Sequence, residues 1–261
     1  MKERFIGAGI MLPLLILVYL GGYFMIAAGF AIGIIGVKEF YGGFVNMGFK
    51  PSYAVGYGAI FALYAINLWM PGNYQIVCAW LVLVVLTSIL YIFKIDEHKA
   101  EDAMATIVGI VYVGFFTYHV VLVDQSAHRE FVWLILIIAF STDIFAYFAG
   151  LALGKHTPKL CPNLSPKKTW AGAVGGTLGA IICSAVFGYF LCPDLLVHCL
   201  ILALVGSPIA QIGDLSASAF KRKMGIKDYG NLIPGHGGVM DRFDSVIMVA
   251  PLVYYYIAFV L

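Results

Sequence analysis

Residues 131–153 read FVWLILIIAFSTDIFAYFAGLAL, an apolar run of 23 residues that contains one charged side chain, Asp143. A helix that crosses the hydrocarbon core of a bilayer needs about 20 such residues. The run therefore predicts a membrane-spanning helix. A carboxylate at that depth is unfavourable unless it has a partner or faces a polar cavity. Asp143 thus indicates either a polar contact between packed helices or an active-site cavity that reaches into the membrane.

The composition extends this prediction to the whole chain. Of the 261 residues, 62% are hydrophobic and 11% are charged, whereas soluble domains carry about 25% charged residues. The mean hydropathy of +0.93 agrees, and together these values exclude a soluble globular domain and a disordered chain. We expect an all-α, polytopic integral membrane protein with about nine transmembrane helices. The predicted spans are Phe5–Leu20, Gly22–Val37, Tyr53–Met70, Tyr74–Phe93, Ala103–Val123, Phe131–Leu153, Trp170–Leu191, Leu195–Gly213 and Phe243–Leu261.

The basic residues predict the orientation of these spans. Lysine and arginine prefer the cytoplasmic side of short loops. With nine spans and a cytoplasmic N-terminus, 15 of the 16 basic residues fall on the cytoplasmic side, and Arg129 is the exception. We therefore expect the N-terminus inside and the C-terminus outside. The net charge of +2 gives no reason to expect a nucleic-acid partner.

Polar residues are concentrated in the second half of the chain. We expect residues 1–130 to form a supporting bundle of about five spans and residues 131–261 to form the catalytic part. The catalytic part carries two long polar loops on the cytoplasmic side, at 154–169 and 214–242. In the seventh span, Gly172, Gly175, Gly176 and Gly179 have the spacing that lets helices approach closely, within the monomer or in a homodimer.

Three carboxylates lie where the last two spans meet the cytoplasmic loop. Asp214 ends the eighth span, and Asp241 and Asp244 begin the ninth. Residues three apart on a helix project from one face, and carboxylates so close repel each other unless a cation or a proton lies between them. Hard oxygen ligands near phosphate groups suit Mg²⁺. The alternative is that Asp241 and Asp244 only stabilise a helix N-terminus.

Basic and glycine-rich segments accompany these carboxylates. Gly235–Gly238 supplies backbone N–H groups beside a helix N-terminus, which favours anions. Lys167-Lys168 and the cluster from Lys221 to Lys227 are candidate phosphate contacts, although both also fit a topology signal at the membrane surface. Together the three features indicate phosphoryl chemistry at the cytoplasmic surface of the membrane.

A resemblance to a known family sharpens this interpretation. Residues 218–244 read SAFKRKMGIKDYGNLIPGHGGVMDRFD, and all 27 positions resemble the signature of the phosphatidate cytidylyltransferases, the CDP-diacylglycerol synthases. The segments Asp143–Tyr147, Gly154-Lys155 and Ser165–Thr169 resemble the same family. The resemblance covers about Ser141 to Asp244, whereas the N-terminal spans agree only in hydropathy and number.

The resemblance implies transfer of CMP from CTP to phosphatidic acid, giving CDP-diacylglycerol and pyrophosphate, with Mg²⁺ as cofactor. It implies Asp214, Asp241 and Asp244 as metal ligands or organisers of the metal, and Lys167 and Lys168 as catalytic phosphate contacts. The substrate-binding candidates are Asp143, Ser218, Lys221, Arg222, Lys227, Asp228, His236, Gly237, Gly238 and Arg242. Whether His236 binds phosphate, acts as an acid or shapes its loop stays open.

Two other functions remain as alternatives. An ion-coupled transporter would use Asp143 and Asp214 as cation sites, but it would need polar residues through the full depth of the membrane. A CTP-dependent kinase that phosphorylates a lipid alcohol would use similar groups. We expect the protein in a bacterial plasma membrane, with its active site facing the cytoplasm.

Overall fold

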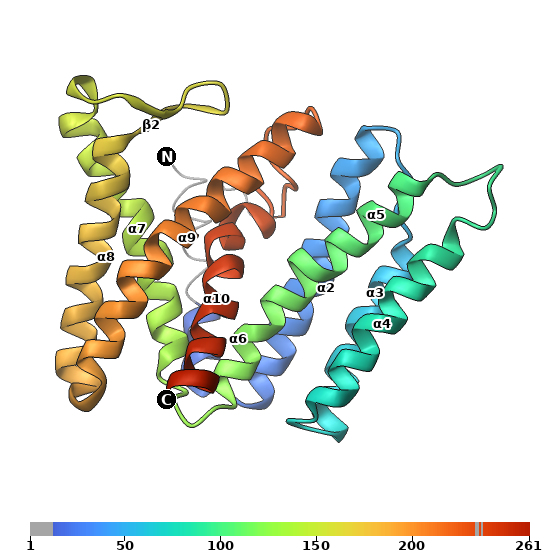
Figure 1. The fold of residues 1–261 in the computed structure, drawn as a ribbon, viewed down its shortest axis with the longest axis horizontal. Helices are drawn as coiled ribbons and strands as arrows, with labels where there is room; N and C mark the ends of the chain where they lie inside the picture. The colour runs from blue at the N-terminus through green and yellow to red at the C-terminus, as the bar shows by residue number, and fades with distance from the viewer. Residues whose placement is uncertain (1–12, 233–234, 236) are drawn as a thin grey trace. The chain divides into compact units, whose positions relative to one another are not determined.

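The computed structural model describes residues 13–232, 235 and 237–261, and the chain is mostly helical (Figure 1). The helical segment 13–20 precedes the labelled helices. These are α2 (Tyr23–Asn46), α3 (Tyr53–Trp69), α4 (Tyr74–Tyr91), α5 (Ala100–Val108), α6 (Phe116–Asp124), α7 (Phe131–Leu153), α8 (Trp170–Leu191), α9 (Leu196–Lys223) and α10 (Met240–Val260). A π-helical segment, Gly109–Phe115, joins α5 to α6 into one continuous rod.

Seven of the described helical segments are long and apolar enough to cross a membrane, and α3 is shorter. The chain is therefore a helical integral membrane protein, as its composition predicts. Much of the first predicted span, Phe5–Leu20, lies outside the described residues. The count of nine spans and the orientation of the termini stay predictions.

The predicted bounds of two central spans are confirmed at both ends, because α7 and α8 cover Phe131–Leu153 and Trp170–Leu191. The prediction of a polar loop over 214–242 is wrong at its start. Helix α9 continues to Lys223, and Gly225 follows with a φ of 68°, a conformation that commonly ends helices because glycine has no Cβ penalty there. Polar residues can extend a helix beyond the apolar depth of the membrane, so a change in hydropathy does not mark where it stops.

The loop over 154–169 also contains a short β-hairpin that the sequence did not predict, within a chain that is mostly helical as expected. Strands β1 (Lys159–Cys161) and β2 (Ser165–Thr169) pair antiparallel. The buried Thr169 then caps α8, since its hydroxyl accepts the Gly172 N–H at 3.1 Å. The strand thus places Lys167 and Lys168 directly before a fixed helix start.

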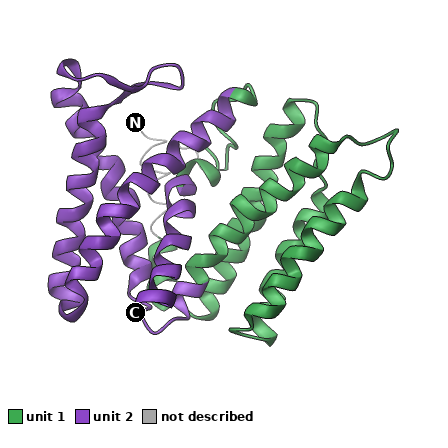
Figure 2. Ribbon diagram, in the orientation of Figure 1, with its two compact units in different colours: residues 1–121, 223–242 green, residues 122–222, 243–261 purple. Residues whose placement is uncertain are grey.

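The chain divides into two compact units, drawn in Figure 2. Unit 1 comprises residues 1–121 and 223–242, and unit 2 comprises residues 122–222 and 243–261. The predicted boundary between the two parts of the chain lies at residue 130. Contacts between residues instead place the boundary of the compact units near residue 121, and they group 223–242 with the N-terminal helices.

Close packing of α7 on α8 builds the frame of unit 2. A Cβ atom at Gly172 or Gly176 would lie 2.9 or 2.8 Å from the carbonyl oxygens of Ala146 or Thr142. Only glycine allows the two backbones to approach so closely. The glycine spacing of the seventh span therefore serves helix packing within one chain.

Candidate functional site

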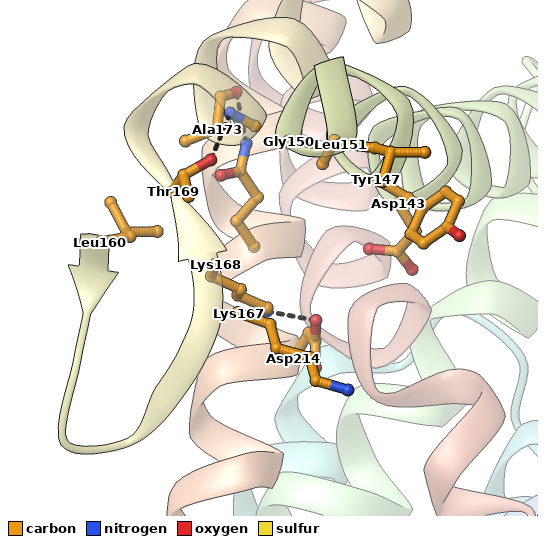
Figure 3. A pocket seen from close by; sticks show the side chains of 13 residues that line it. Asp143, Tyr147, Gly150, Leu151, Leu160, Lys167, Lys168, Thr169, Ala173 and Asp214 are labelled. Carbon is orange, nitrogen blue, oxygen red and sulfur yellow. Dashed lines mark hydrogen bonds and ion pairs between the residues drawn. The ribbon is translucent and has the colours of Figure 1, made fainter. Parts of the chain in front are cut away.

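A cavity of about 400 Å³ opens in unit 2 between α7, the β2 strand, α8 and α9 (Figure 3). A volume of this order suits a small ligand. Small residues of α7 and α8 make room for this cavity, and polar side chains line its wall. Those polar residues are Asp143, Tyr147, Lys167, Lys168, Thr169, Gln211 and Asp214.

An ion pair between Lys168 and Asp214 lies at the wall of this cavity. The Lys168 ammonium group donates to the Asp214 carboxylate, and both side chains are about 70% buried, with 28% and 30% of their surface exposed. Successive strand residues point to opposite faces, so Lys167 leaves β2 in another direction and is exposed. The cavity therefore holds one lysine engaged with a carboxylate and a second lysine that is more accessible.

Two further carboxylates of unit 2 lie near this pair. The buried Asp244 accepts the Ser245 N–H at 2.8 Å, and the charges of Asp214, Asp143 and Lys221 are close enough to act on it. Helices α9 and α10 approach closely here, because a Cβ at Gly213 would lie 2.7 Å from the Asp244 carbonyl oxygen. Glycine at 213 thus allows Asp214 and Asp244 to gather in one region.

The predicted substrate residues of α9 follow Asp214 along the helix. Ser218 and Lys221 come four and seven residues after Asp214, a spacing that keeps all three on one face. Arg222, one position further, is exposed. The helical end of α9 therefore brings Ser218 and Lys221 to the side of the helix that carries the ion pair.

In unit 1, Asp241 binds the backbone of its own signature loop. Its Oδ2 accepts the Tyr229 N–H at 2.8 Å and the Gly238 N–H at 3.0 Å. Gly237 has a φ of 84°, and a Cβ there would lie 2.9 Å from the same oxygen, so glycine is required on both counts. The expected anion-binding N–H group of Gly238 donates to this carboxylate in the structure.

The remaining predicted residues of this region differ in how far they are exposed. Lys227 and Asp228 are exposed, and His236 lies outside the described residues. Arg242 is half-buried, and its Nε is fully buried without a hydrogen-bond partner in the described part of the chain. A buried guanidinium nitrogen without a partner is costly, and an anion such as phosphate would satisfy it.

The donor chemistry of unit 2 fits Mg²⁺. Among the described residues, no three His, Cys, Asp or Glu side chains form a ready-made metal cage. Mg²⁺ is usually bound through one or two carboxylates, with water and substrate phosphates completing the shell. Asp214 and Asp244 supply carboxylates of this kind, and so they suit an ion that arrives with a nucleotide.

Three residues that were not predicted from the sequence have polar contacts in the structure. Gln211 lines the cavity, where its amide nitrogen donates to the Ala173 carbonyl oxygen at 3.1 Å and to the Thr177 hydroxyl at 3.3 Å. Thr169 lines it as well. Glu39, in unit 1, binds the start of α10. A polar residue within an apolar run was the available signal for Gln211 and Glu39.

Comparison with known proteins extends these observations. The sequence model of the cytidylyltransferase family matches residues 2–260. A protein of Staphylococcus epidermidis named phosphatidate cytidylyltransferase is 33% identical over 261 residues, which cover 97% of each chain. A Bacillus subtilis protein of the same name is 32% identical over 237 residues, or 79% of this chain and 87% of that protein. With the Brucella abortus protein of that name the identity is 41% over 148 residues, so the match spans about half of that relative (54%).

Proposed function

Because the chain belongs to the cytidylyltransferase family, we propose that it transfers CMP from CTP to phosphatidic acid. The products are CDP-diacylglycerol and pyrophosphate. The observation that carries the proposal is the gathering of carboxylates and lysines around one cavity of unit 2. Nucleotidyl transfer needs this combination, since both substrates are phosphate anions.

In the proposed reaction, a phosphate oxygen of phosphatidic acid attacks the α-phosphorus of CTP. The bond from the α-phosphorus to the bridging oxygen breaks, and pyrophosphate leaves with its electron pair. The attacking phosphate is already anionic, and therefore no side chain has to remove a proton first. The protein's task is to position the two phosphates and to compensate their charge.

Basic side chains supply that compensation. Lys167 is exposed at the cavity, and its ammonium group can therefore contact a phosphate group directly. Lys168 would exchange the Asp214 carboxylate for a phosphate oxygen when substrate enters. Lys221 and Arg222 at the end of α9 and the buried Arg242 Nε are the further phosphate contacts that we propose.

We assign Mg²⁺ to Asp214 and Asp244, because Mg²⁺ is usually bound through one or two carboxylates together with substrate phosphates and water. When bound, the ion supplies positive charge that polarises the reacting phosphate and stabilises the leaving pyrophosphate. Asp214 and Asp143 line the cavity, and the buried Asp244 is the third carboxyl group of this region. Asp241 as a metal ligand stays a prediction.

The purified full-length chain in detergent tests the activity directly. With CTP, Mg²⁺ and phosphatidic acid we expect release of pyrophosphate together with formation of CDP-diacylglycerol. A diacylglycerol or polyprenol in place of phosphatidic acid is the second arm. Release of CDP and a phosphorylated lipid in that arm, without pyrophosphate in the first, would establish the lipid-alcohol kinase instead.

We also propose that the site faces the cytoplasm of a bacterial plasma membrane, with the N-terminus inside and the C-terminus outside. The 15-to-1 division of basic residues supports this orientation. Alkaline phosphatase fused after Leu261 should be active in bacterial cells, because this enzyme folds only outside the cytoplasm. An inactive but intact fusion would reverse the orientation. A homodimer stays a prediction.

A further inference from the structure

Glu39 in α2 reaches the beginning of α10, about 200 residues later in the chain. Its Oε1 accepts the Val239 N–H at 3.0 Å, and its Oε2 accepts the Met240 N–H at 2.9 Å. The first N–H groups of a helix have no partner within the helix, and negative charge is stabilised there. Glu39 therefore acts as a bidentate cap for α10, supplied by a distant helix of the same unit.

The face of α2 around Glu39 packs against the signature loop. Gly36, Glu39, Phe40 and Gly43 follow the i, i+3, i+4, i+7 spacing of one helix face. A Cβ at Gly36 would lie 3.5 Å from the Met240 sulfur. The fully buried Phe40 lies with its ring centroid 6.0 Å from that of Tyr229. This face thus contacts both ends of the segment between Tyr229 and Met240.

The loop itself is shaped around the Glu39 carboxylate. A Cβ at Gly230 would lie 2.8 Å from the Glu39 carboxyl carbon, and a Cβ at Gly238 would lie 2.6 Å from it. Such separations are shorter than van der Waals contact, so side chains at either position would displace the carboxylate. Glycine at 230 and 238 therefore leaves the space that Glu39 fills.

Glu39 and Asp241 accept different backbone N–H groups of this loop. Asp241 accepts the N–H groups of Tyr229 and Gly238, while Glu39 accepts those of Val239 and Met240. The two carboxylates together fix four backbone N–H groups in the segment that carries Asp241 and Arg242.

We propose that Glu39 is a positioning residue of the cytidylyltransferase reaction. It holds Val239 and Met240 at the start of α10, so that Asp241 and Arg242 keep one orientation toward the substrate phosphates. This role rests on the proposed function for its effect on rate. Its effect on loop order does not depend on that function.

Glu39→Gln in the full-length chain tests the role with little change in size. The amide keeps one acceptor oxygen but turns an NH₂ donor toward the second backbone N–H, so one of the two bonds is lost. We expect kcat to fall on the order of 10- to 100-fold, the scale of a small misplacement of reacting groups, with a smaller change in KM for CTP. Amide hydrogen exchange should quicken in peptides covering 229–242 and stay unchanged in α3 and α4.

Two further variants control this result. Glu101→Gln makes the same chemical change at an exposed position of α5 and should leave rate and exchange as in the parent. Glu39→Asp keeps the charge on a side chain one methylene shorter and should restore part of the rate. If Glu39→Gln does not fold, Glu39→Asp alone decides, because full parental rate and exchange in it would overturn the role.

A double-mutant cycle with Gly230 separates contact from general damage. Gly230→Ala should disturb the loop in the parent because its methyl group meets the Glu39 carboxylate. In the Glu39→Ala background that obstacle is gone, and Gly230→Ala should add little to the loss of rate or of exchange protection. Additive losses would contradict the contact.

The proposal is overturned if Glu39→Gln keeps parental exchange in 229–242, or if protection falls equally in α3 and α4. If the parent chain itself transfers no CMP, the proposed function fails. In that case quickened exchange confined to 229–242 in Glu39→Gln would still establish Glu39 as the anchor of this loop.

Discussion

Carboxylates have different partners in the two units. In unit 1, Glu39, Asp102 and Asp241 each accept two backbone N–H groups. In unit 2, Asp214 pairs with a lysine ammonium group at the wall of a cavity, and Asp143 lines the same cavity. A backbone N–H is fixed by the fold, whereas a lysine side chain can turn to another anion.

The role of an acidic group in this protein therefore follows from its partner rather than from its residue type. A carboxylate that accepts N–H groups from other segments holds those segments together, whereas Asp244 of unit 2 accepts the N–H of the neighbouring Ser245. One that faces a lysine in a cavity is placed for exchange with substrate or metal. Asp241 lies on the boundary between the two classes, because it anchors a loop and is also a predicted metal ligand.

Asp241→Asn should have the largest effect, because it removes both tasks. We expect a loss of more than about 100-fold in the rate of pyrophosphate release, equivalent to about 2.7 kcal/mol or more. Amide exchange in the loop 229–239 should quicken in the same variant, since the Tyr229 and Gly238 N–H groups lose a charged acceptor. Near-parental rate and Mg²⁺ dependence would remove Asp241 from the metal site.

Asp214→Asn should reduce the rate by about 100-fold, or about 2.7 kcal/mol, without changing exchange elsewhere. Asn keeps the size of Asp but lacks the charge that binds Mg²⁺ and Lys168. Pyrophosphate release against Mg²⁺ concentration is the measurement. Asp194→Asn, the same change at an exposed position of unit 2, is the control. If both variants have equal rates, Asp214 has no part in the reaction.

Much of the fold could be predicted because the bilayer imposes it. Long apolar runs specify spanning helices, and the bounds of α7 and α8 follow from hydropathy alone. The end of α9 does not, since the stretch from Asp214 to Lys223 contains several polar and charged residues and is still helical. The hairpin of Lys159–Thr169 was also missed, because its strands are too short for an alternating pattern to stand out.

The site was predictable only in part. Motif and charge directed attention to Lys168, Asp214 and Asp244, which the structure gathers in unit 2. No local pattern shows that Glu39 contacts Met240, because their proximity depends on how distant helices pack. The glycine-rich loop was interpreted as an anion site, yet its described N–H donors at 238–240 are taken by carboxylates of the chain.

The two lysines of β2 give a smaller and sharper test. Lys167→Ala should raise KM for CTP by about 10-fold, since loss of one charged contact is worth about 1.4 kcal/mol. Lys168→Ala should lower kcat as well, because it leaves Asp214 without its ion-pair partner. Lys159→Ala, on the neighbouring strand β1, removes the same charge as a control. Parental turnover of both variants at sub-saturating CTP would exclude the pair from the site.

Asp102→Asn should have the smallest effect on rate, because Asp102 lies in unit 1, where its carboxylate accepts two backbone N–H groups and lies 3.7 Å from the His98 ring. It is 2% exposed and accepts the Lys50 N–H at 2.6 Å and the Lys99 N–H at 2.9 Å. An amide would leave one buried donor unsatisfied, which costs about 1–3 kcal/mol of stability.

The expected result for Asp102→Asn is a lower thermal midpoint in detergent, with a rate per folded molecule within about twofold of the parent, less than 0.5 kcal/mol in the barrier. Asp96→Asn, exposed in the same connection between α4 and α5, should change neither quantity. A large loss of rate at an unchanged midpoint would show that a backbone-bound carboxylate of unit 1 takes part in catalysis. That outcome would break the distinction between the two units, because the partners of a carboxylate would then no longer indicate its task.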